Sequence, residues 1–394
     1  MNGLIDLLKK PTRVIIGVMS GTSLDGVDVA LTRVSGSGAT VDIDLLAFHS
    51  EAYPSDLRSL LLQNAAVETS NVRDLSQLNI RLAHTYAAAV HSLLAEADCP
   101  LEEVDAIGCH GQTVFHVPDA TTCAGIDVTS TLQIGDPSTL ANLLGVPVVG
   151  QFRQADMALG GQGAPLVPYF DYVFLRDAHE TRGLLNLGGI ANLTIIPAGA
   201  GLNEVAAFDT GPANMVMDAL AQRLYGQPRD EGGRIAAQGT VHQPLLDVLL
   251  ADPYYALPPP KSTGREKYTE GFIDELLHRA VVLTPPDILA TATALTAETI
   301  ARAYTEFFAE TTPLDRLVAA GGGVHNATLM RMLAERFAPI PVQTLHDLGL
   351  DPDAKEAICF AVLAHETLNG APSNVPSATG ATRTAVLGVI ALPS

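Results

Sequence analysis

The stretch at residues 17–28, GVMSGTSLDGVD, constrains the fold most, because it joins two apolar segments near the N-terminus. Residues 13–19 are rich in β-branched side chains and too few for a helix, so they predict a strand buried on both faces. Residues 27–34 predict its partner. The turn between them holds two glycines, three hydroxyl side chains and a carboxylate. This composition leaves backbone N–H groups free to approach an anion, and Asp25 or Asp28 would hold a cation.

An ordinary hairpin connection is the alternative interpretation of this turn, because Ser, Thr, Gly and Asp all favour turns. A minimal hairpin needs roughly two to five loop residues, and the turn at residues 20–26 is longer than that. Apart from Leu24, its residues are all polar or small. The surplus length favours phosphate chemistry.

The composition indicates a compact globular protein that has no general basic surface. The 394 residues are 47% hydrophobic and 17% charged, and 23 basic against 43 acidic residues give a formal net charge of −20. This balance argues against binding of nucleic acid or an anionic membrane, so local groups must hold any anionic ligand. The four cysteines include no C-x-x-C pair and fit a reducing compartment. With no leader-like N-terminus and no apolar run of membrane-spanning length, a soluble cytoplasmic protein is expected.

The order of predicted elements occurs twice, which predicts an α/β fold built from a duplicated half. In the first half, a third alternating strand completes an antiparallel meander, and helices and further strands follow it. Its predicted elements are the strand 41–48, the helices 56–64 and 71–97, the strand 104–110, and the strand 131–135 with a helix that ends near Gly145. The second half repeats strand, glycine turn and returning strand at 183–196, a strand at 205–209, and then helices.

Helices dominate residues 243–308, and the proline-rich stretch 257–264 interrupts them. Consecutive prolines cannot continue a helix, so this stretch is predicted to be an exposed loop. A strand at 316–320 then runs into three glycines, and another helix starts near Asn326.

Phosphate binding must use something other than the common nucleotide motifs, because the chain lacks both G-x-x-x-x-G-K-[ST] and G-x-G-x-x-G. Three glycine corners, at residues 20–26, 187–190 and 320–324, instead follow predicted strands, which is where open α/β sheets place ligands. As a set they predict a nucleotide held between the two halves.

Asp209 follows an apolar strand and precedes the predicted helix 215–224. It would either cap that helix or act as a general base at a strand end, where a carboxylate meets a hydroxyl or water poised against a phosphoryl group. The residues alone leave both interpretations open.

A second candidate cluster surrounds Arg153. Its guanidinium matches a substrate carboxylate in bidentate geometry, although a surface arginine is the more common case. Residues 160–168 combine three glycines, two prolines and a glutamine, so they line a pocket or make a tight crossing. His110 lies at the end of a predicted strand, where we expect a supporting role.

A series of short motifs runs in order along nearly the whole chain. They are GVMSGTSLDG at 17–26, GCHGQT at 108–113, QIGDP at 133–137, GGQGAPLVP at 160–168, LNLGGIAN at 185–192, FDTGP at 208–212, PKSTGRE at 260–266, GGGVHN at 321–326 and DAKEAI at 353–358. With these motifs the sequence resembles the 1,6-anhydro-N-acetylmuramate kinases of bacterial peptidoglycan recycling.

The resemblance implies the fold shared by sugar kinases, Hsp70 and actin, in which two RNase-H-like domains close on ATP and Mg²⁺ and form a nucleotide and substrate cleft. We expect an N-terminal domain at residues 1–147, to which about 374–394 return, and a C-terminal domain at 148–373. In the implied reaction, the base Asp209 activates water to attack C1 of the anhydro sugar. The released O6 takes the γ-phosphoryl group, which gives N-acetylmuramate 6-phosphate and ADP. A homodimer is a family-level expectation.

The expected site residues fall into three sets besides Asp209. The ATP set is Gly21, Thr22, Ser23, Leu24, Asp25, Gly26, Val27, Asp28, Gly188, Gly189, Asn192, Gly321, Gly322 and Gly323. The sugar set is His110, Gln112, Arg153, Gly161, Gln162 and Gly163. The metal set is Asp25 and Asp28.

Two positions depart from the family pattern. Gln151 stands where the family usually has aspartate, which keeps hydrogen bonding but loses a charge. Ala213 stands where glycine is usual, and it disfavours a left-handed backbone. Neither change removes the base or the glycine corners, so activity is expected. Two alternative functions remain open: a hexose kinase of the same fold that opens no ring, and a nucleotide-switched ATPase or binding protein.

Overall fold

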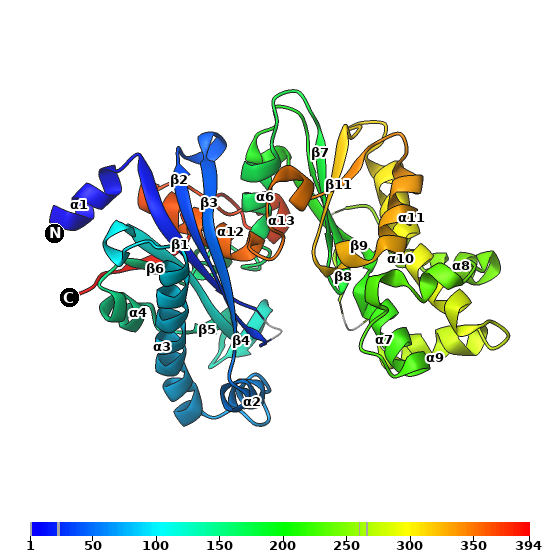
Figure 1. Ribbon diagram of the computed structural model, residues 1–394, viewed down its shortest axis with the longest axis horizontal. Coiled ribbons are helices and arrows are strands. Elements are labelled where there is room, and N and C mark those ends of the chain that lie inside the picture. Colours follow the sequence, from blue (N-terminus) through cyan, green and yellow to red (C-terminus); the bar gives the residue numbers. More distant parts are fainter. Residues whose placement is uncertain (1, 22–23, 260, 265–266) are drawn as a thin grey trace. The chain divides into compact units, whose positions relative to one another are not determined.

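The computed structural model describes residues 2–21, 24–259, 261–264 and 267–394, which form two compact units (Figure 1). The first unit holds the chain up to Phe174 together with Asp353–Ser394, and the second holds Leu175–Pro352. These boundaries differ from the predicted ones at 147 and 373. The reason is that α6 (Val167–Leu175) and α12 (Lys355–Asn369) contact each other within the first unit, where the Tyr169 hydroxyl donates to Glu366 Oε1 at 2.7 Å.

The first unit is built on a mixed sheet (Figure 1). Its first three strands form an antiparallel meander, and the fourth strand lies parallel to the first. The strands are β1 (Thr12–Ser20), β2 (Gly26–Ser35), β3 (Asp42–Ala52), β4 (Ala106–Cys123), β5 (Ile126–Ile134), β6 (Val148–Gly150) and β12 (Val389–Ala391), in the order β12-β6-β4-β1-β2-β3 with β5 beside β4.

The second unit repeats this topology. Its strands are β7 (Arg182–Leu187), β8 (Ile190–Ile196), β9 (Ala206–Pro212), β10 (Arg316–Ala320) and β11 (Val342–Thr344), in the order β11-β10-β7-β8-β9. As in the first unit, the first three strands are antiparallel, and the fourth and fifth run parallel beside the first. The prediction of a duplicated, RNase-H-like α/β half is therefore confirmed.

An aspartate before the fourth strand fixes the parallel pairing in each unit. Asp105 donates its N–H to the carbonyl oxygen of Val14 at 2.8 Å, and its Oδ2 accepts the Val14 N–H at 3.0 Å. Asp315 makes the same two bonds to Thr181, at 2.9 and 2.8 Å. The same device therefore sets the register where the parallel pairing begins in both halves.

Helices cover the sheets. Those of the first unit are α1 (Asn2–Lys9), α2 (Ser55–Asn64), α3 (Val72–Glu96), α4 (Pro137–Leu144), α5 (Gln154–Met157), α6, α12 and α13 (Pro376–Thr379). Those of the second unit are α7 (Asn214–Tyr225), α8 (Gln243–Leu250), α9 (Glu270–Arg279), α10 (Pro285–Phe307) and α11 (Ala327–Phe337). In the described residues, no helix is long and apolar enough to cross a membrane.

The largest difference from the sequence prediction concerns the strand expected at 131–135. It belongs to β5, which pairs antiparallel with the long β4 and forms a hairpin. The next parallel strand is instead β6, and both β6 and β11 are only three residues long. Segments this short show no readable periodicity, so the sequence pattern missed them.

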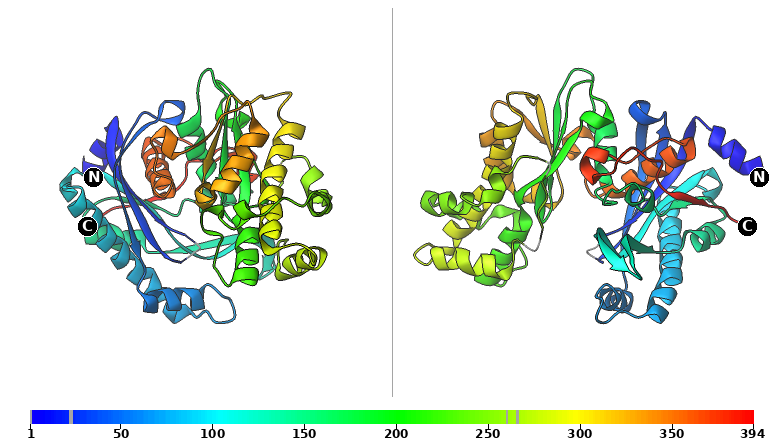
Figure 2. Two further views of the ribbon diagram at one scale, coloured as in Figure 1. Left: turned by 45° about the vertical axis from the view of Figure 1, so that its right-hand side comes forward. Right: turned by 180° about the vertical axis from the view of Figure 1, so that it is seen from behind.

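Two glycines let α12 pack against the centre of the first sheet. Gly17 and Gly108 are register partners on β1 and β4. A Cβ atom would lie 1.7 Å from the Ala357 carbonyl oxygen at Gly17, and 2.1 Å from that of Phe360 at Gly108. Side chains alternate along a strand, so the neighbours of Gly17 face the other side and join the core that includes α3. Helices α3 and α12 thus cover opposite faces of this sheet (Figure 2).

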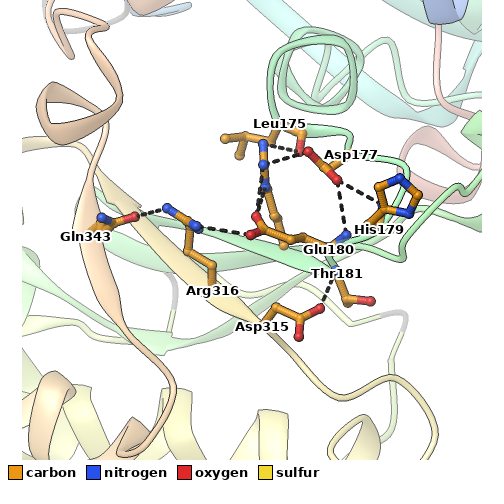
Figure 3. A network of polar contacts seen from close by, with 9 residues as sticks. Leu175, Asp177, His179, Glu180, Thr181, Asp315, Arg316 and Gln343 are labelled. Carbon is orange, nitrogen blue, oxygen red and sulfur yellow. Dashed lines mark hydrogen bonds and ion pairs between the residues drawn. The ribbon is translucent and has the colours of Figure 1, made fainter.

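A polar network ties the entry into the second unit to its parallel strands (Figure 3). Arg182 donates to Asp177 Oδ2 at 2.8 Å and to Glu180 Oε2 at 3.0 Å. Arg316 donates to Glu180 Oε1 at 3.2 Å and to Gln343 Oε1 at 2.6 Å. The network lies at the start of β7, β10 and β11, and the glycine corners lie at the opposite ends of β7 and β10.

We predict that Gly17→Ala destabilises the first unit by about 3 kcal/mol or more, because the new methyl group would overlap the α12 backbone. Urea unfolding followed by circular dichroism measures the change, since the chain contains no tryptophan. Gly3→Ala is the matched control: Gly3 lies in α1 with no atom within 4 Å of an added Cβ, so we expect a change below about 1 kcal/mol. An unchanged urea midpoint in Gly17→Ala would contradict this packing.

Candidate active site

Asp209 lies on β9, the edge strand of the second sheet, opposite Asn192 on β8. The Asn192 Nδ2 donates to Asp209 Oδ1 at 3.0 Å. The backbone N–H of Thr263 donates to Asp209 Oδ2, also at 3.0 Å. Each carboxylate oxygen therefore accepts an N–H group, which fixes the rotation of this half-buried side chain.

Of the two interpretations that the sequence left open for Asp209, the helix cap is wrong. Helix α7 starts at Asn214, and Ala213, at its N-cap position, makes no side-chain capping bond. Asp209 instead pairs within the sheet. It lies inside β9, which continues to Pro212, and not at the strand end that the sequence predicted. Its role as a general base stays a prediction.

The loop at 257–264 was predicted to be exposed, and this is only half correct. Its residues 261 and 263 lie along the open edge of β9, where Asp209 donates its N–H to the Lys261 carbonyl oxygen at 3.1 Å. The Tyr254 hydroxyl donates to the Asp209 carbonyl oxygen at 2.8 Å. The physical reason is that an edge strand offers unpaired N–H and C=O groups, and this segment satisfies them at Asp209.

The two glycine corners of the second unit lie together at the ends of β7 and β10. Gly188 accepts the Asn214 N–H at 3.0 Å, so the β7–β8 turn packs on the start of α7. Gly321 has φ +80°, and a Cβ atom there would lie 2.9 Å from the Leu187 carbonyl oxygen. Gly323 is equally close to β7, since its Cβ would lie 2.5 Å from that of Leu187. Only glycine allows this approach of the two corners.

In the first unit, neighbouring side chains hold the turn between β1 and β2. The Gly21 carbonyl oxygen accepts a bond from Gln112 Nε2 at 2.9 Å, and the Leu24 carbonyl oxygen accepts one from Arg58 Nε, also at 2.9 Å. Leu24 has φ +55° and is buried, so it contributes its backbone rather than its side chain to this turn. The predicted residues Thr22 and Ser23 lie outside the described residues.

The other residues expected here belong to β2. Gly26 starts the strand, Val27 is buried in the core, and Asp28 is half-buried next to the exposed Asp25. Burial raises the pKa of Asp28, and the negative charges of Asp25 and Asp353 add to that rise, while a hydrogen bond from Ser50 opposes it. Among the described residues, no three His, Cys, Asp or Glu side chains are grouped as a ready-made metal site.

Arg153 is held by two other residues of the predicted sugar set. Its Nε and one Nη donate to His110 Nε2 at 3.1 and 2.8 Å, and the other Nη donates to the Gly163 carbonyl oxygen at 2.7 Å. Burial and, secondly, the positive charge of Arg153 lower the pKa of His110 to about 3. His110 is therefore neutral and accepts from Arg153. Both His110 and Gln112 are buried, so we interpret them as supports for Arg153 and Gly21.

Asp156 is a buried residue of this cluster that no sequence pattern indicates. Its Oδ2 accepts the Gly163 N–H at 2.8 Å, and its Oδ1 accepts from Asn374 and Thr379, both at 2.7 Å. A buried carboxylate must be hydrogen-bonded in this way. The bonds join residues 161–163 to a segment more than 200 positions later, so no local sequence signal marks Asp156. Gly161 is buried beside it, and Gln162 is exposed.

The two departures from the family pattern have different structural settings. Gln151 has φ +57°, a left-handed backbone that is uncommon outside glycine, two residues before Arg153. Ala213 has φ −125°, so its backbone is not left-handed and the methyl group meets no such penalty.

We predict that His110→Gln reduces the acid sensitivity of the fold. An unfolded histidine has a pKa of about 6.5, and the folded value is about 3. Between these values only the unfolded chain binds the proton, so stability falls as the pH drops from 6.5 towards 3. At pH 5 His110 lowers the free energy of unfolding by about 2 kcal/mol relative to pH 8, and His110→Gln lacks this loss. Urea unfolding of both proteins at pH 8 and pH 5 measures the effect. The difference at pH 8 gives the stability lost through altered packing. If the free energy of unfolding falls equally in both proteins between pH 8 and pH 5, the prediction is wrong.

Comparisons with known proteins agree over nearly the whole chain. The sequence model of the family described as anhydro-N-acetylmuramic acid kinase matches residues 13–393. A protein named anhydro-N-acetylmuramic acid kinase from Salinibacter ruber (strain DSM 13855 / M31) is 54% identical over 395 residues, which cover 100% of both chains. Proteins with the same name from Caldanaerobacter subterraneus subsp. tengcongensis and Bacillus thuringiensis subsp. konkukian are 40% and 44% identical, over 100% and 96% of this chain and 100% and 99% of theirs. The chain therefore belongs to the anhydro-N-acetylmuramic acid kinase family.

Proposed function

We propose that this chain uses ATP to phosphorylate 1,6-anhydro-N-acetylmuramic acid at O6 while water opens the anhydro ring, which gives N-acetylmuramate 6-phosphate and ADP. The observation that carries the proposal is the Asp209 carboxylate, held on both oxygens within β9 in a chain of this family. The reaction would serve peptidoglycan recycling. A cytoplasmic location and a homodimer remain predictions.

Asp209 is the proposed general base. It removes one proton from a water molecule as the water oxygen attacks C1, and the C1–O6 bond breaks. The second hydrogen of the water remains in the new C1 hydroxyl group. The released O6 takes the γ-phosphoryl group of ATP, and ADP leaves. Each Asp209 oxygen accepts one N–H group in the bonds described above, which orients the carboxylate for its reaction with the water.

The nucleotide is assigned to the glycine corners. In the second unit these are Gly188 with Gly189, and Gly321–Gly323, whose backbones lie close together at the ends of β7 and β10. In the first unit the proposed nucleotide-binding segment is the turn between β1 and β2, which Gly21 begins. Backbone N–H groups at strand ends suit phosphate oxygens, and they do so without the basic surface that this acidic chain lacks.

Asp25 and Asp28 are the proposed Mg²⁺ ligands. Their carboxylates are the hard oxygen donors that Mg²⁺ prefers, and Mg²⁺ is usually held by one or two carboxylates together with phosphate oxygens and water. Burial raises the pKa of Asp28 and the charge of Asp25 adds to that rise, so a cation beside them would relieve a repulsion that exists in the protein alone. Bound Mg²⁺ would neutralise charge on the phosphates.

Arg153 is the proposed partner of the sugar carboxylate. The neutral His110 accepts two of its N–H groups and Gly163 accepts a third, so the guanidinium plane is fixed before substrate arrives. A planar, fixed guanidinium matches a carboxylate in bidentate geometry. This arrangement favours an acidic sugar over a neutral hexose.

We predict that Asp209→Asn lowers kcat by about 10²- to 10⁴-fold, because the amide keeps the shape of the side chain but cannot accept the proton. The assay measures ADP and sugar 6-phosphate formed from ATP, Mg²⁺ and the anhydro sugar. Asp247→Asn, on the exposed surface of α8, is the control and should keep the wild-type rate. Turnover of Asp209→Asn near the wild-type rate would refute the assigned role.

Isotope labelling tests the ring-opening step. In H₂¹⁸O, water attack should place one ¹⁸O atom at C1 of the product and none in the phosphate. Early time points, and unlabelled product incubated alone in the same water, correct for slow exchange at C1. Phosphorylation without label at C1 would favour a kinase that opens no ring. ATP hydrolysis that no sugar changes would favour a nucleotide-switched protein.

A further inference from the structure

The residues around Asp209 divide into two groups that act on different parts of it. Asn192 and the Thr263 N–H each bond one carboxylate oxygen, both at 3.0 Å. Tyr254 and Lys261 bond its backbone, through the Tyr254 hydroxyl and the Lys261 carbonyl oxygen. We name Asn192, Tyr254, Lys261 and Thr263 the Asp209 clamp.

Lys261 holds the two parts of the segment 254–263 together. Its ammonium group donates to the carbonyl oxygens of Tyr254 and Tyr255 at 3.2 and 3.0 Å. It also lies 4.9 Å from the centre of the Tyr254 ring, at cation–π distance. Burial lowers the pKa of this half-buried lysine. Its positive charge is stabilised by carbonyl oxygens and by the face of the Tyr254 ring instead of by water. The ammonium group therefore ties Tyr254 to the residues that run on to Thr263.

Asn192 is placed by the sheet itself. It pairs with Asp209 in the β8–β9 register, and the register shifts immediately before it, between Ala191 and Asn192. Directly opposed residues on one face of an antiparallel pair have neighbouring side chains. The Nδ2 of Asn192 is thereby directed at the carboxylate, although the sequence motif places this residue in the predicted ATP set.

We propose that the Asp209 clamp positions the general base, so that Asn192 is a positioning residue for Asp209 rather than an ATP ligand. This inference rests on the proposed function, in which Asp209 receives the proton of the attacking water. The chemical advantage is orientation. The Asn192 amide and the Thr263 N–H fix the carboxylate plane, and a misplacement of about 1 Å can cost on the order of 100-fold in rate.

Steady-state kinetics of two Asn192 variants test the proposal. Asn192→Ala removes the donor to Oδ1, so kcat should fall by about 10- to 100-fold while KM for ATP stays within about twofold of wild type. Asn192→Asp places a second carboxylate beside Asp209, so the acid limb of the kcat–pH profile should move up by about one pH unit. Raised KM for ATP with unchanged kcat would overturn the proposal and restore the ATP assignment.

Thr210→Val is the matched control. The Thr210 hydroxyl donates to the Ala191 carbonyl oxygen at 3.2 Å, so this variant also removes a side-chain bond between β8 and β9, one residue from Asp209. It should lower stability without moving the kcat–pH profile. If Thr210→Val lowers kcat as much as Asn192→Ala does, the effect belongs to strand pairing and the proposal fails.

Lys261 variants test the other half of the clamp. Lys261→Met keeps the apolar stem and removes the charge, so the Thr263 N–H should exchange with solvent about tenfold faster and kcat should fall. Lys261→Arg keeps a cation over the Tyr254 ring, so it should recover most of the slow exchange at Thr263 and most of kcat. Unchanged exchange at Thr263 in Lys261→Met would overturn the role of Lys261.

Two measurements separate this inference from the proposed function. If the wild-type protein forms no 6-phosphate from the anhydro sugar, the proposed function fails. Hydrogen exchange at Thr263 needs neither ATP nor sugar, so it judges the Asp209 clamp independently. If the wild type is active and Asn192→Ala matches it in kcat, only the positioning role fails.

Discussion

The parallel pairing of the first and fourth strands is the constraint on which both units depend. In each, an aspartate directly before the fourth strand exchanges two hydrogen bonds with the first, Asp105 with Val14 and Asp315 with Thr181. Parallel pairing brings the C-terminal ends of neighbouring strands to one edge. This register therefore decides at which edge of its sheet each glycine turn lies. The turns are those after β1, β7 and β10.

Neutral donors hold two buried carboxylates and the half-buried Asp209 in this acidic chain. Asp156 and Glu366 accept bonds from backbone N–H, hydroxyl and amide groups, and Asp209 accepts from an amide and a backbone N–H. The buried pair of Asp171 and Lys355, at 2.8 Å, is the contrasting case. Neutral donors fix the orientation of a carboxylate without adding a charge, which suits a base that must itself accept a proton.

Much of the fold was predictable because its strands are long and apolar and its glycines stand at their ends. Local patterns predict the meander and its repetition. They also predict the two glycine corners of the second unit, at Gly188–Gly189 and Gly321–Gly323. What failed was short or non-local. β6 and β11 have three residues each, and Asp156 has partners far along the chain. Asn192 belongs to the same motif as Gly188 and Gly189 and was therefore expected to bind ATP. Only strand pairing brings its side chain to Asp209.

The sequence by itself determined the duplicated α/β pattern, the positions of the glycine corners, the candidate base and the family, since each depends on local spacing or on ordered motifs. Tertiary structure alone decided which groups hold that base. The proline-rich loop turned out to pair the open edge of β9, and His110 turned out to be a buried neutral acceptor for Arg153. Hydrogen-bond partners of this kind are set by strand register and burial, which join residues whose separation along the chain carries no periodic signal.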